Sequence, residues 1–252
     1  MSAPNKYTFM TLNIRGTKCP VKRKCILYYL KQHKVDIALL QETHLTDSEH
    51  DKLKREWVGQ VYYSSFTSRA RGVAILINKI CPFQIQSQIK DKGGRFVIIQ
   101  GFFSTEPITN VNVYGSNHDD PKSYQEIFLK LMCPSSEIIM AGDFNLVLDP
   151  SSDRSSSNSI NLTQAAKMLK AEMKHYGLVD LWRFHNQKVK EYSFYSPVHD
   201  SYSRIELFLI PAAKGSLTTG CKYLPRCISD HSALLASVPV SREEDGGLAH
   251  TC

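Results

Sequence analysis

Short apolar runs, each closed by a polar or turn-forming segment, recur along most of the chain. Near-continuous runs of this kind are typical of strands buried in a sheet. They predict strands at residues 7–16, 36–42, 72–78, 96–103, 110–115 and 137–145, a strand–loop–strand unit over 192–210, and a last strand in the second half of 228–238.

Three other segments are predicted as helices, and two of them carry apolar residues at helical spacing. The spacing predicts helices at residues 21–35 and 162–177, the latter ending at Gly177, a residue favoured just beyond a helix C-terminus, and the third segment, about 121–131, is predicted as a more polar helix. Strands that alternate with helices indicate an α/β sandwich.

The domain organisation follows from what interrupts this pattern. The segment 149–159 is rich in Ser, Asp and Asn, so we expect a surface loop there. No clear linker divides the chain, and we therefore predict one domain over residues 1–238. The polar residues 239–252 should form a frayed tail or the start of a linker.

The predicted strands share a feature at their ends, where each buried run is followed by a polar residue. These residues are Asn13, Gln41, Glu42, Tyr114, Asp143 and Asn145, and Asp230 and His231 stand directly before the last strand. Ligand sites in α/β sheets commonly lie just beyond strand ends, so the shared position predicts one active site. Residues two apart in a strand share a face, so Asp143 and Asn145 should point together while Phe144 anchors the opposite face, provided the strand continues that far.

The residue types indicate the chemistry. Glu42, Asp143 and Asp230 offer hard carboxylate oxygens, and the two asparagines offer neutral ones, a mixture that suits Mg²⁺ beside a phosphate. An imidazole oriented by a carboxylate can help to activate water near neutral pH. Neighbouring strand residues point apart, so Asp230 should not orient His231. Glu206, which leads into another apolar run, is the better candidate.

Composition adds two constraints. Basic residues exceed acidic ones by 31 − 24 = 7, with clusters at residues 18–24 and 90–95, and such a surface attracts polyanions. The seven cysteines are odd in number and lack metal-site spacing, which favours reduced thiols in a cytosolic or nuclear protein. No apolar run is long enough to cross a bilayer and the first residues lack a secretory pattern, so we expect a soluble protein.

Seven motifs in order resemble a known family. They are "LNIRG", "LLQETHL", "NVYGSN", "AGDFNLVLDPSSDRSS", "DLWRFHN", "YSFYSPVHDSYSRIE" and "SDHS", and they extend from about residue 7 to 238. In this order they resemble the exonuclease–endonuclease–phosphatase superfamily, which includes deoxyribonuclease I and the apurinic/apyrimidinic endonucleases. More narrowly, they are similar to the endonuclease domain of LINE-type non-LTR retrotransposons.

The resemblance implies a four-layered α/β sandwich of two mixed sheets flanked by helices, and Mg²⁺-dependent cleavage of DNA, with Mn²⁺ as a substitute, that leaves a 3′-hydroxyl. It implies that Glu42 holds the metal with help from Asn13, and that Asp230 completes the metal environment. Asp143 and Asn145 would orient or activate the nucleophile and the phosphate, Tyr114 would contact the phosphate, and His231 would act with Glu206. The division of base and phosphate-binding duties between Asp143 and His231 stays open.

The same resemblance implies a DNA-binding surface. Residues that would touch or frame DNA are Asn117, Arg154, Ser193, Arg204 and Ser229, although a surface salt bridge is an equal alternative for the two arginines. Residues 196–203 would form a hairpin loop that probes the minor groove near the cut.

Two positions depart from the family pattern. Glu206 stands where aspartate is usual, and the longer side chain needs a small adjustment to reach His231, so we expect activity to be retained. Gly115 follows Tyr114 where relatives often carry a proline-containing pair, which makes this loop less rigid.

The favoured function is a nicking endonuclease whose product primes reverse transcription. The expected partners are double-stranded DNA and a reverse transcriptase region downstream in the same polyprotein, with the nucleus as the site of action and the isolated domain a monomer. Three alternatives stay open: a repair-type apurinic endonuclease, a domain that binds DNA without cutting it, and a phosphatase for small phosphoesters.

Overall fold

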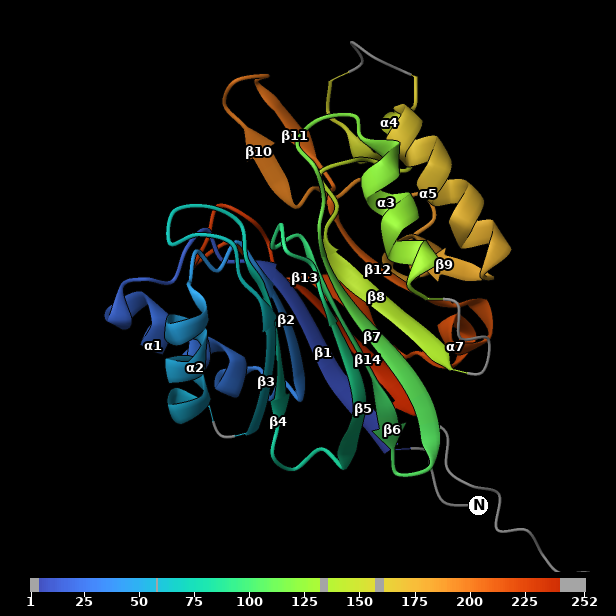
Figure 1. The fold of residues 1–252 in the computed structure, drawn as a ribbon. Helices are drawn as coiled ribbons and strands as arrows, with labels where there is room; N and C mark the ends of the chain where they lie inside the picture. The colour runs from blue at the N-terminus through green and yellow to red at the C-terminus, as the bar shows by residue number, and fades with distance from the viewer. Residues whose placement is uncertain (1–4, 58, 132–135, 157–160, 241–252) are drawn as a thin grey trace, which may run out of the picture.

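Two six-stranded mixed sheets pack face to face in the computed structural model, which describes residues 5–57, 59–131, 136–156 and 161–240 (Figure 1). The first sheet has the order β13-β14-β1-β2-β4-β3. Its strands are β1 Asn5–Asn13, β2 Ile37–Gln41, β3 Gly59–Ser64, β4 Val73–Asn78, β13 Cys221–Tyr223 and β14 Leu234–Val240.

The second sheet has the order β5-β6-β7-β8-β12-β9. Its strands are β5 Phe83–Lys90, β6 Phe96–Phe103, β7 Glu106–Tyr114, β8 Glu137–Asp143, β9 Leu178–Asp180 and β12 Glu206–Pro211. A separate hairpin pairs β10 Phe194–Ser196 with β11 Ser201–Ser203 and projects beyond the ends of the sheets (Figure 1).

Helices cover the outer face of each sheet, which gives the predicted four layers (Figure 1). Buried side chains of α1 Pro20–Gln32 and α2 Asp47–Glu56 pack on the first sheet, and those of α3 Pro121–Leu129 and α5 Gln164–His175 pack on the second. The shorter helices are α4 Pro150–Asp153, α6 Leu181–His185 and α7 Ala212–Leu217. The apolar runs become buried strands because each sheet is covered on both faces.

A polar tie crosses the apolar layer between the sheets close to the strand ends. The amide of Gln41 donates to Asn112 Oδ1 at 2.7 Å, and Asn112 Nδ2 donates to the carbonyl oxygens of Leu40 and Ala74. Each of these hydrogen bonds replaces one that the buried amides would otherwise make with water. The tie fixes β7 of the second sheet against β2 and β4 of the first.

Strand register aligns polar residues at the ends of both sheets. Tyr114 of β7 lies opposite Asp143 of β8, which lies opposite Glu206 of β12. In the first sheet Asn13 of β1 lies opposite Gln41 of β2. Register alone therefore gathers residues that are widely separated along the chain.

The structure adds elements that the sequence pattern did not predict. The helix α2 is almost entirely polar, and the edge strand β5 buries mainly Phe83, so neither shows an apolar run. The segment predicted as a surface loop at 149–159 begins with α4, in which Asp153 is completely buried, and residues 157–160 lie outside the described residues.

The C-terminal boundary also differs from the expectation. Strand β14 extends to Val240, two residues beyond the predicted end of the domain, and Val240 pairs with Asn5. The tail from residue 241 to 252 lies outside the described residues. Within the described ranges, no helix combines the length and apolar character needed to cross a membrane.

Candidate active site

Five of the predicted residues form an unbroken line of contacts across the ends of the two sheets. Asn13 Nδ2 donates to Glu42 Oε1 at 2.9 Å and to Asp143 Oδ2 at 2.8 Å. Asp143 Oδ2 lies 3.9 Å from His231 Nδ1, which is hydrogen-bonded to Glu206 Oε1. The predicted convergence is therefore present, although the residues come from five different segments of the chain.

Glu42 is held in place by neighbours from several directions. It adopts a left-handed backbone conformation with φ 51°, which is uncommon for a residue with a Cβ and which occurs directly after β2 ends. His44 Nε2 lies 3.2 Å from Glu42 Oε2, on the side away from Asn13. Burial, and then the Glu42 carboxylate beside it, raises the pKa of Tyr114, so the phenol stays protonated and can donate.

Asp143 ends β8, and the chain leaves strand geometry directly after it. Phe144 is completely buried in the core under α3 and α5, as predicted. Asn145, however, has φ 51°, so it does not share a strand face with Asp143 as expected. Its backbone N–H donates to Asp143 Oδ1 at 2.9 Å, and its side chain donates to the carbonyl of Gly115. Gly115 permits the close approach of the two segments because it has no side chain: a Cβ there would lie 2.1 Å from the Phe144 carbonyl oxygen.

The predicted pair of Glu206 and His231 is present. The Glu206 carboxylate is completely buried, and its backbone carbonyl accepts a hydrogen bond from Tyr223 at 2.6 Å. The Phe194 ring stacks on the imidazole at 4.4 Å between ring centres. The extra methylene of glutamate is thus accommodated without losing the contact to His231.

The two groups at the centre of the line have strongly shifted pKa values. Burial lowers the pKa of His231, but the adjacent Glu206 carboxylate outweighs burial and raises the pKa to about 9. Burial, with Glu206 as the second cause, raises the pKa of Asp143 to about 7. At neutral pH the imidazole therefore carries a proton, while the Asp143 carboxyl can readily accept or release one.

Asp230 does not join this line. Its Oδ2 pairs with Arg15 Nη1 at 2.6 Å, and its Oδ1 accepts from the hydroxyl of Ser229 at 3.2 Å. The prediction that it shares metal-binding duty with Glu42 and Asn13 is thus not supported by a contact between them. As predicted, Asp230 and His231 have separate partners.

Asn13 serves to arrange carboxylates. Its Nδ2 donates to two of them, and its Oδ1 accepts from the Arg15 backbone N–H at 3.0 Å. The two carboxylates require a donor at this point, which fixes the orientation of the amide. A direct metal contact through Asn13 would have to share the oxygen that Arg15 already uses.

The donor set suits a hard divalent cation. Asp143 and Glu206 bring carboxylate oxygens within 4.8 Å of each other, and Glu206 Oε2 is buried without a hydrogen-bond partner among the described residues. His231 lies in the same cluster, but its protonated ring pairs with Glu206 and offers no lone pair to a metal. A buried carboxylate oxygen without a partner is costly, and a cation or a bound water removes that cost. Glu42 adds a carboxylate at the open edge of the same line.

The predicted DNA-contacting residues divide into two groups. Asn117 and Arg154 line an open depression of about 410 Å³ together with Asn145, Phe194 and hairpin residues, and Ser229 is half-buried next to Asp230. Ser193 and Arg204 are buried, so their side chains do not reach a DNA surface. The Ser193 hydroxyl instead accepts from the Ile205 backbone N–H at 2.9 Å. Arg204 forms salt bridges with two aspartates, as in the alternative given for it, but these salt bridges are buried and not on the surface.

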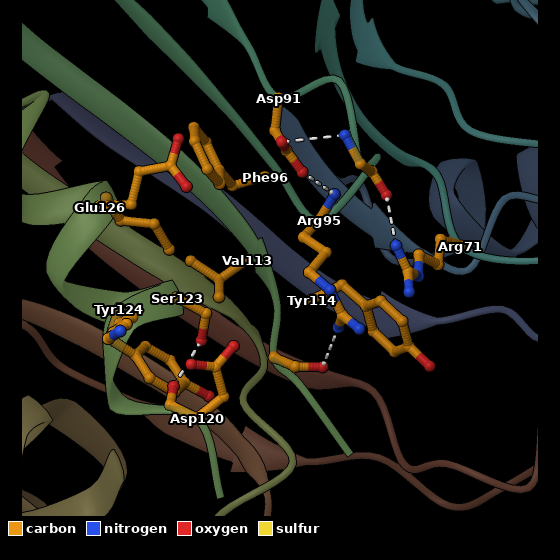
Figure 2. Close-up of a pocket in the computed structure, with 14 residues that line it drawn as sticks. Arg71, Asp91, Arg95, Phe96, Val113, Tyr114, Asp120, Ser123, Tyr124 and Glu126 are labelled. Atoms are coloured by element: carbon orange, nitrogen blue, oxygen red, sulfur yellow. Dashed lines mark hydrogen bonds between the residues drawn. The ribbon is translucent and has the colours of Figure 1, made fainter. Parts of the chain in front are cut away.

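Two further depressions have Tyr114 in their lining. One, of about 340 Å³, is lined by Glu42, His44, Tyr114, Asn117, His118 and three arginines, Arg69, Arg71 and Arg95. The other, of about 240 Å³, opens toward α3. Figure 2 shows Arg95 reaching across from the Asp91 turn toward Tyr114, with its guanidinium bonded to the Gly115 carbonyl at 3.0 Å. Arginines therefore lie directly next to the acidic line.

Sequence reasoning did not single out His44, Arg15 or Phe194. His44 could have been found, since it follows Glu42 by two residues at the same strand exit. Arg15 stands two residues after Asn13 in the same way. Phe194 gave no signal, because its contact with His231 joins segments that only the fold brings together.

A model of the Endonuclease/Exonuclease/phosphatase family matches residues 10–231. The chain belongs to this family. Its membership accounts for the two-sheet architecture and for a polar line at the strand ends, and it identifies the chain as a hydrolase.

Relatives of this family member include a transposon protein. The chain is 24% identical over 230 residues to the transposon TX1 uncharacterized 149 kDa protein of Xenopus laevis, and the match covers 89% of the chain but only 17% of that protein. The fold is similar to that of the AP endonuclease LMAP from Leishmania major, with a TM-score of 0.74 and 16% identity over 94% of this chain and 88% of that one. It is also similar to the endonuclease domain of TRAS1, a telomere-specific non-LTR retrotransposon, with a TM-score of 0.67 and 17% identity over 93% and 99%.

Proposed function

We propose that the chain is a Mg²⁺-dependent endonuclease that nicks one strand of target DNA in the course of retrotransposition. The observation that carries this proposal is the line from Glu42 through Asn13, Asp143 and His231 to Glu206. The match to a much longer transposon protein supports the biological setting.

The reaction adds water to phosphorus and breaks the bond to O3′, which leaves a 3′-hydroxyl and a 5′-phosphate. Asp143 would accept the proton of the attacking water, since its raised pKa makes it an effective base near neutral pH. His231 uses Nδ1 for Glu206, so its Nε2–H is left to donate to a phosphate oxygen. Asn145 would hold the Asp143 carboxylate through its backbone N–H.

A divalent cation at Glu42 and the neighbouring carboxylates would neutralise charge that builds up on the phosphate during cleavage. Tyr114, kept protonated, would donate to the same phosphate from the opposite side. These assignments divide the roles left open by sequence, with Asp143 as base and His231 as a cationic donor.

A polymeric substrate is favoured over a small phosphoester. The depression next to Tyr114 carries Arg69, Arg71 and Arg95, and the depression next to Asn145 carries Arg154. Phosphates along a DNA strand would therefore meet arginine in both depressions. The net charge of +7 acts in the same direction.

The decisive test is conversion of supercoiled plasmid to open circle in Mg²⁺ by the wild type and by Asp143→Asn. We expect the substitution to lower the nicking rate by about 10² to 10⁴, the range for loss of a general base. Asp47→Asn, the same change on the exposed first turn of α2, should leave the rate unchanged. Equal nicking by wild type and Asp143→Asn would refute the proposal.

Two additional measurements define the product and the substrate. A DNA polymerase should extend the nicks without prior phosphatase treatment, as a 3′-hydroxyl requires. Intact and abasic duplexes should be cut at similar rates, whereas a strong abasic preference would assign the chain to repair.

We infer that a reverse transcriptase in the same polyprotein uses the 3′-hydroxyl in the nucleus, with the nuclease domain acting as a monomer.

A further inference from the structure

The buried side chain of Arg204 is the centre of a charge cluster that no step of the proposed reaction uses. Its Nε donates to Asp153 Oδ1 at 2.8 Å and its Nη2 to Asp153 Oδ2 at 3.0 Å, and Nη2 also lies 2.6 Å from Asp180 Oδ2. Arg183 Nη2 donates to Asp153 Oδ1 at 2.6 Å. We refer to Arg204, Asp153, Asp180 and Arg183 as the Arg204 clamp.

The Arg204 clamp joins two adjacent segments that both line the depression of about 410 Å³. Asp153 ends α4 and directly precedes Arg154, which lines the depression. Arg204 lies between Ser203 and Ile205, which line it from the hairpin side. Asp153 and Arg204 are therefore immediate chain neighbours of lining residues, while their own side chains are buried.

Backbone hydrogen bonds extend this connection. The Arg204 N–H donates to the Asp153 carbonyl at 2.9 Å, and the Ser155 N–H donates to the Tyr202 carbonyl at 3.0 Å. The Ser155 hydroxyl accepts from the Tyr202 N–H at 2.8 Å. The segment after α4 thus runs along β11 as an additional edge, and its position determines that of the hairpin.

A buried arginine that donates two hydrogen bonds to one carboxylate, as Arg204 does to Asp153, need not add stability. Replacing a buried ion pair with apolar residues of similar size is often neutral or stabilising, whereas the two-pronged geometry fixes distance and angle. Trp182 lies under both guanidinium groups, at 4.9 Å from that of Arg183 and 5.1 Å from that of Arg204, which restricts them further. These features suit a device that sets geometry.

We propose that Arg204 is a positioning residue for substrate selection, which holds the Arg154 segment in place against the hairpin so that the depression accepts only DNA of a particular local shape. This inference rests on the proposed nicking function. It replaces the direct DNA contact expected for Arg204 from sequence with an indirect role.

The test compares three proteins with the wild type. Arg204→Lys keeps the charge but loses the fork, and the double variant Arg204→Met with Asp153→Asn removes one charge of each sign, so the net charge of the clamp is unchanged. Leu30→Ala, or the milder Ile26→Val, on α1 behind the first sheet serves as a control of matched loss in Tm. Each is assayed for nick positions on a plasmid, for kcat and KM on a duplex with the preferred site, and for hydrogen exchange of β11 amides.

Both Arg204 variants should spread the nicks over more sites and raise KM about tenfold, within the range of up to about 10²-fold that small misplacements cause. Their kcat should change less than their KM, and the β11 amides should exchange faster than in the control. An unchanged nick pattern and KM at a lowered Tm would overturn the proposal. If the wild type does not nick at all, the nicking function fails, and unchanged β11 exchange in the variants would separately refute the clamp.

Discussion

Asp143 and His231 show how burial and one charged neighbour change the pKa values of ordinary side chains. Both lie at the ends of strands, and both have Glu206 as a neighbour. The same carboxylate favours the proton on His231 and disfavours the charge on Asp143. One buried glutamate therefore sets the protonation of the two groups that the proposed reaction needs.

This arrangement predicts a specific dependence of stability on pH. The pKa of Asp143 rises from 3.8 in the unfolded chain to about 7 in the fold. The stability that this group contributes is therefore present below pH 4 and lost as the pH rises through 7. Asp143→Asn removes the ionisation, so the variant should gain stability relative to wild type over this interval, by at most about 4 kcal/mol.

Urea unfolding in EDTA at pH 5 and pH 8 measures the difference. The free energies of unfolding of the two proteins should differ by a constant amount because of the altered hydrogen bonds to Asn13 and Asn145. Only the increase of this difference with pH reports on ionisation of Asp143. A difference that is the same at both pH values would contradict the assignment. Added Mg²⁺ should reduce the growth, because a nearby cation favours the ionised carboxylate.

At the level of single residues, the sequence predicted where the reactive groups stand and that Glu206 pairs with His231, but not the other contacts of these groups. The change from apolar to polar at each strand end located Glu42, Asp143 and Glu206, since this change is a local property. Whether Asp230 faces a metal or Arg15, and whether Arg204 faces DNA or Asp153, depends on segments far away in the chain. Local pattern carries no information on such contacts.

The β10–β11 hairpin projects from the two sheets (Figure 1), and none of its residues belongs to the buried hydrophobic clusters of the described chain. Val198 at its tip is 87% exposed, and Tyr195 and Asp200 close it through a hydrogen bond of 2.7 Å. Its inward side lines the depression next to Asn145. Such an element can change without affecting the fold.

Replacing residues 197–200 with an Asn-Gly turn should therefore alter site choice more than stability. We expect the free energy of unfolding to change by less than about 1 kcal/mol, as for an exposed position, while nicks lose their preferred positions. Primer-extension mapping of the nicks on a plasmid measures this.

The turn between β6 and β7 provides the matched control, because it lies at the opposite end of β7 from Tyr114. Ser104→Asn with Thr105→Gly places the same dipeptide there and should leave the nick positions unchanged. If the shortened hairpin keeps the wild-type pattern, the hairpin plays no part in selecting DNA.

Elements with a strong apolar signature were predictable, and those without it were not. Strands such as β4 and β8 are buried on both faces, so their composition identified them. The edge strand β5 and the helix α2 are largely polar because solvent covers one side. For α2 a signal was nevertheless present, since Thr46 and Glu49 form a capping box at its start.

Over the whole molecule, charge and architecture act together. The helices cover the outer faces of both sheets, so the strand ends are the part of the sandwich left open to a large substrate. The arginines around Tyr114 lie at this open end. These arginines place part of the basic charge of the chain at the site.

This view predicts a position-dependent effect of salt on DNA affinity. Measured in the non-cleaving Asp143→Asn background, the slope of log K against log salt should fall in magnitude by about 1 when Arg69→Ala removes one phosphate contact. Lys24→Ala, an equal charge change on the exposed side of α1, should leave the slope unchanged. Equal effects of the two substitutions would mean that DNA is attracted without a defined path.

The α/β sandwich was predictable from strands that alternate with helices, whereas its four layers were predicted from the family resemblance. The pairing order of the strands was not, since it depends on contacts between distant segments such as β8 with β12.

The alignment of Tyr114, Asp143 and Glu206 in one cross-strand row has a consequence for how such a protein can change over evolutionary time. Adding or deleting a single amino acid within β7, β8 or β12 would displace one member by about 3.3 Å and turn it to the other side. The catalytic floor can thus diversify only by exchange of side chains. The loops above it can be lengthened or rebuilt, and under the proposed function new DNA targets can be acquired there while the cutting chemistry is inherited intact.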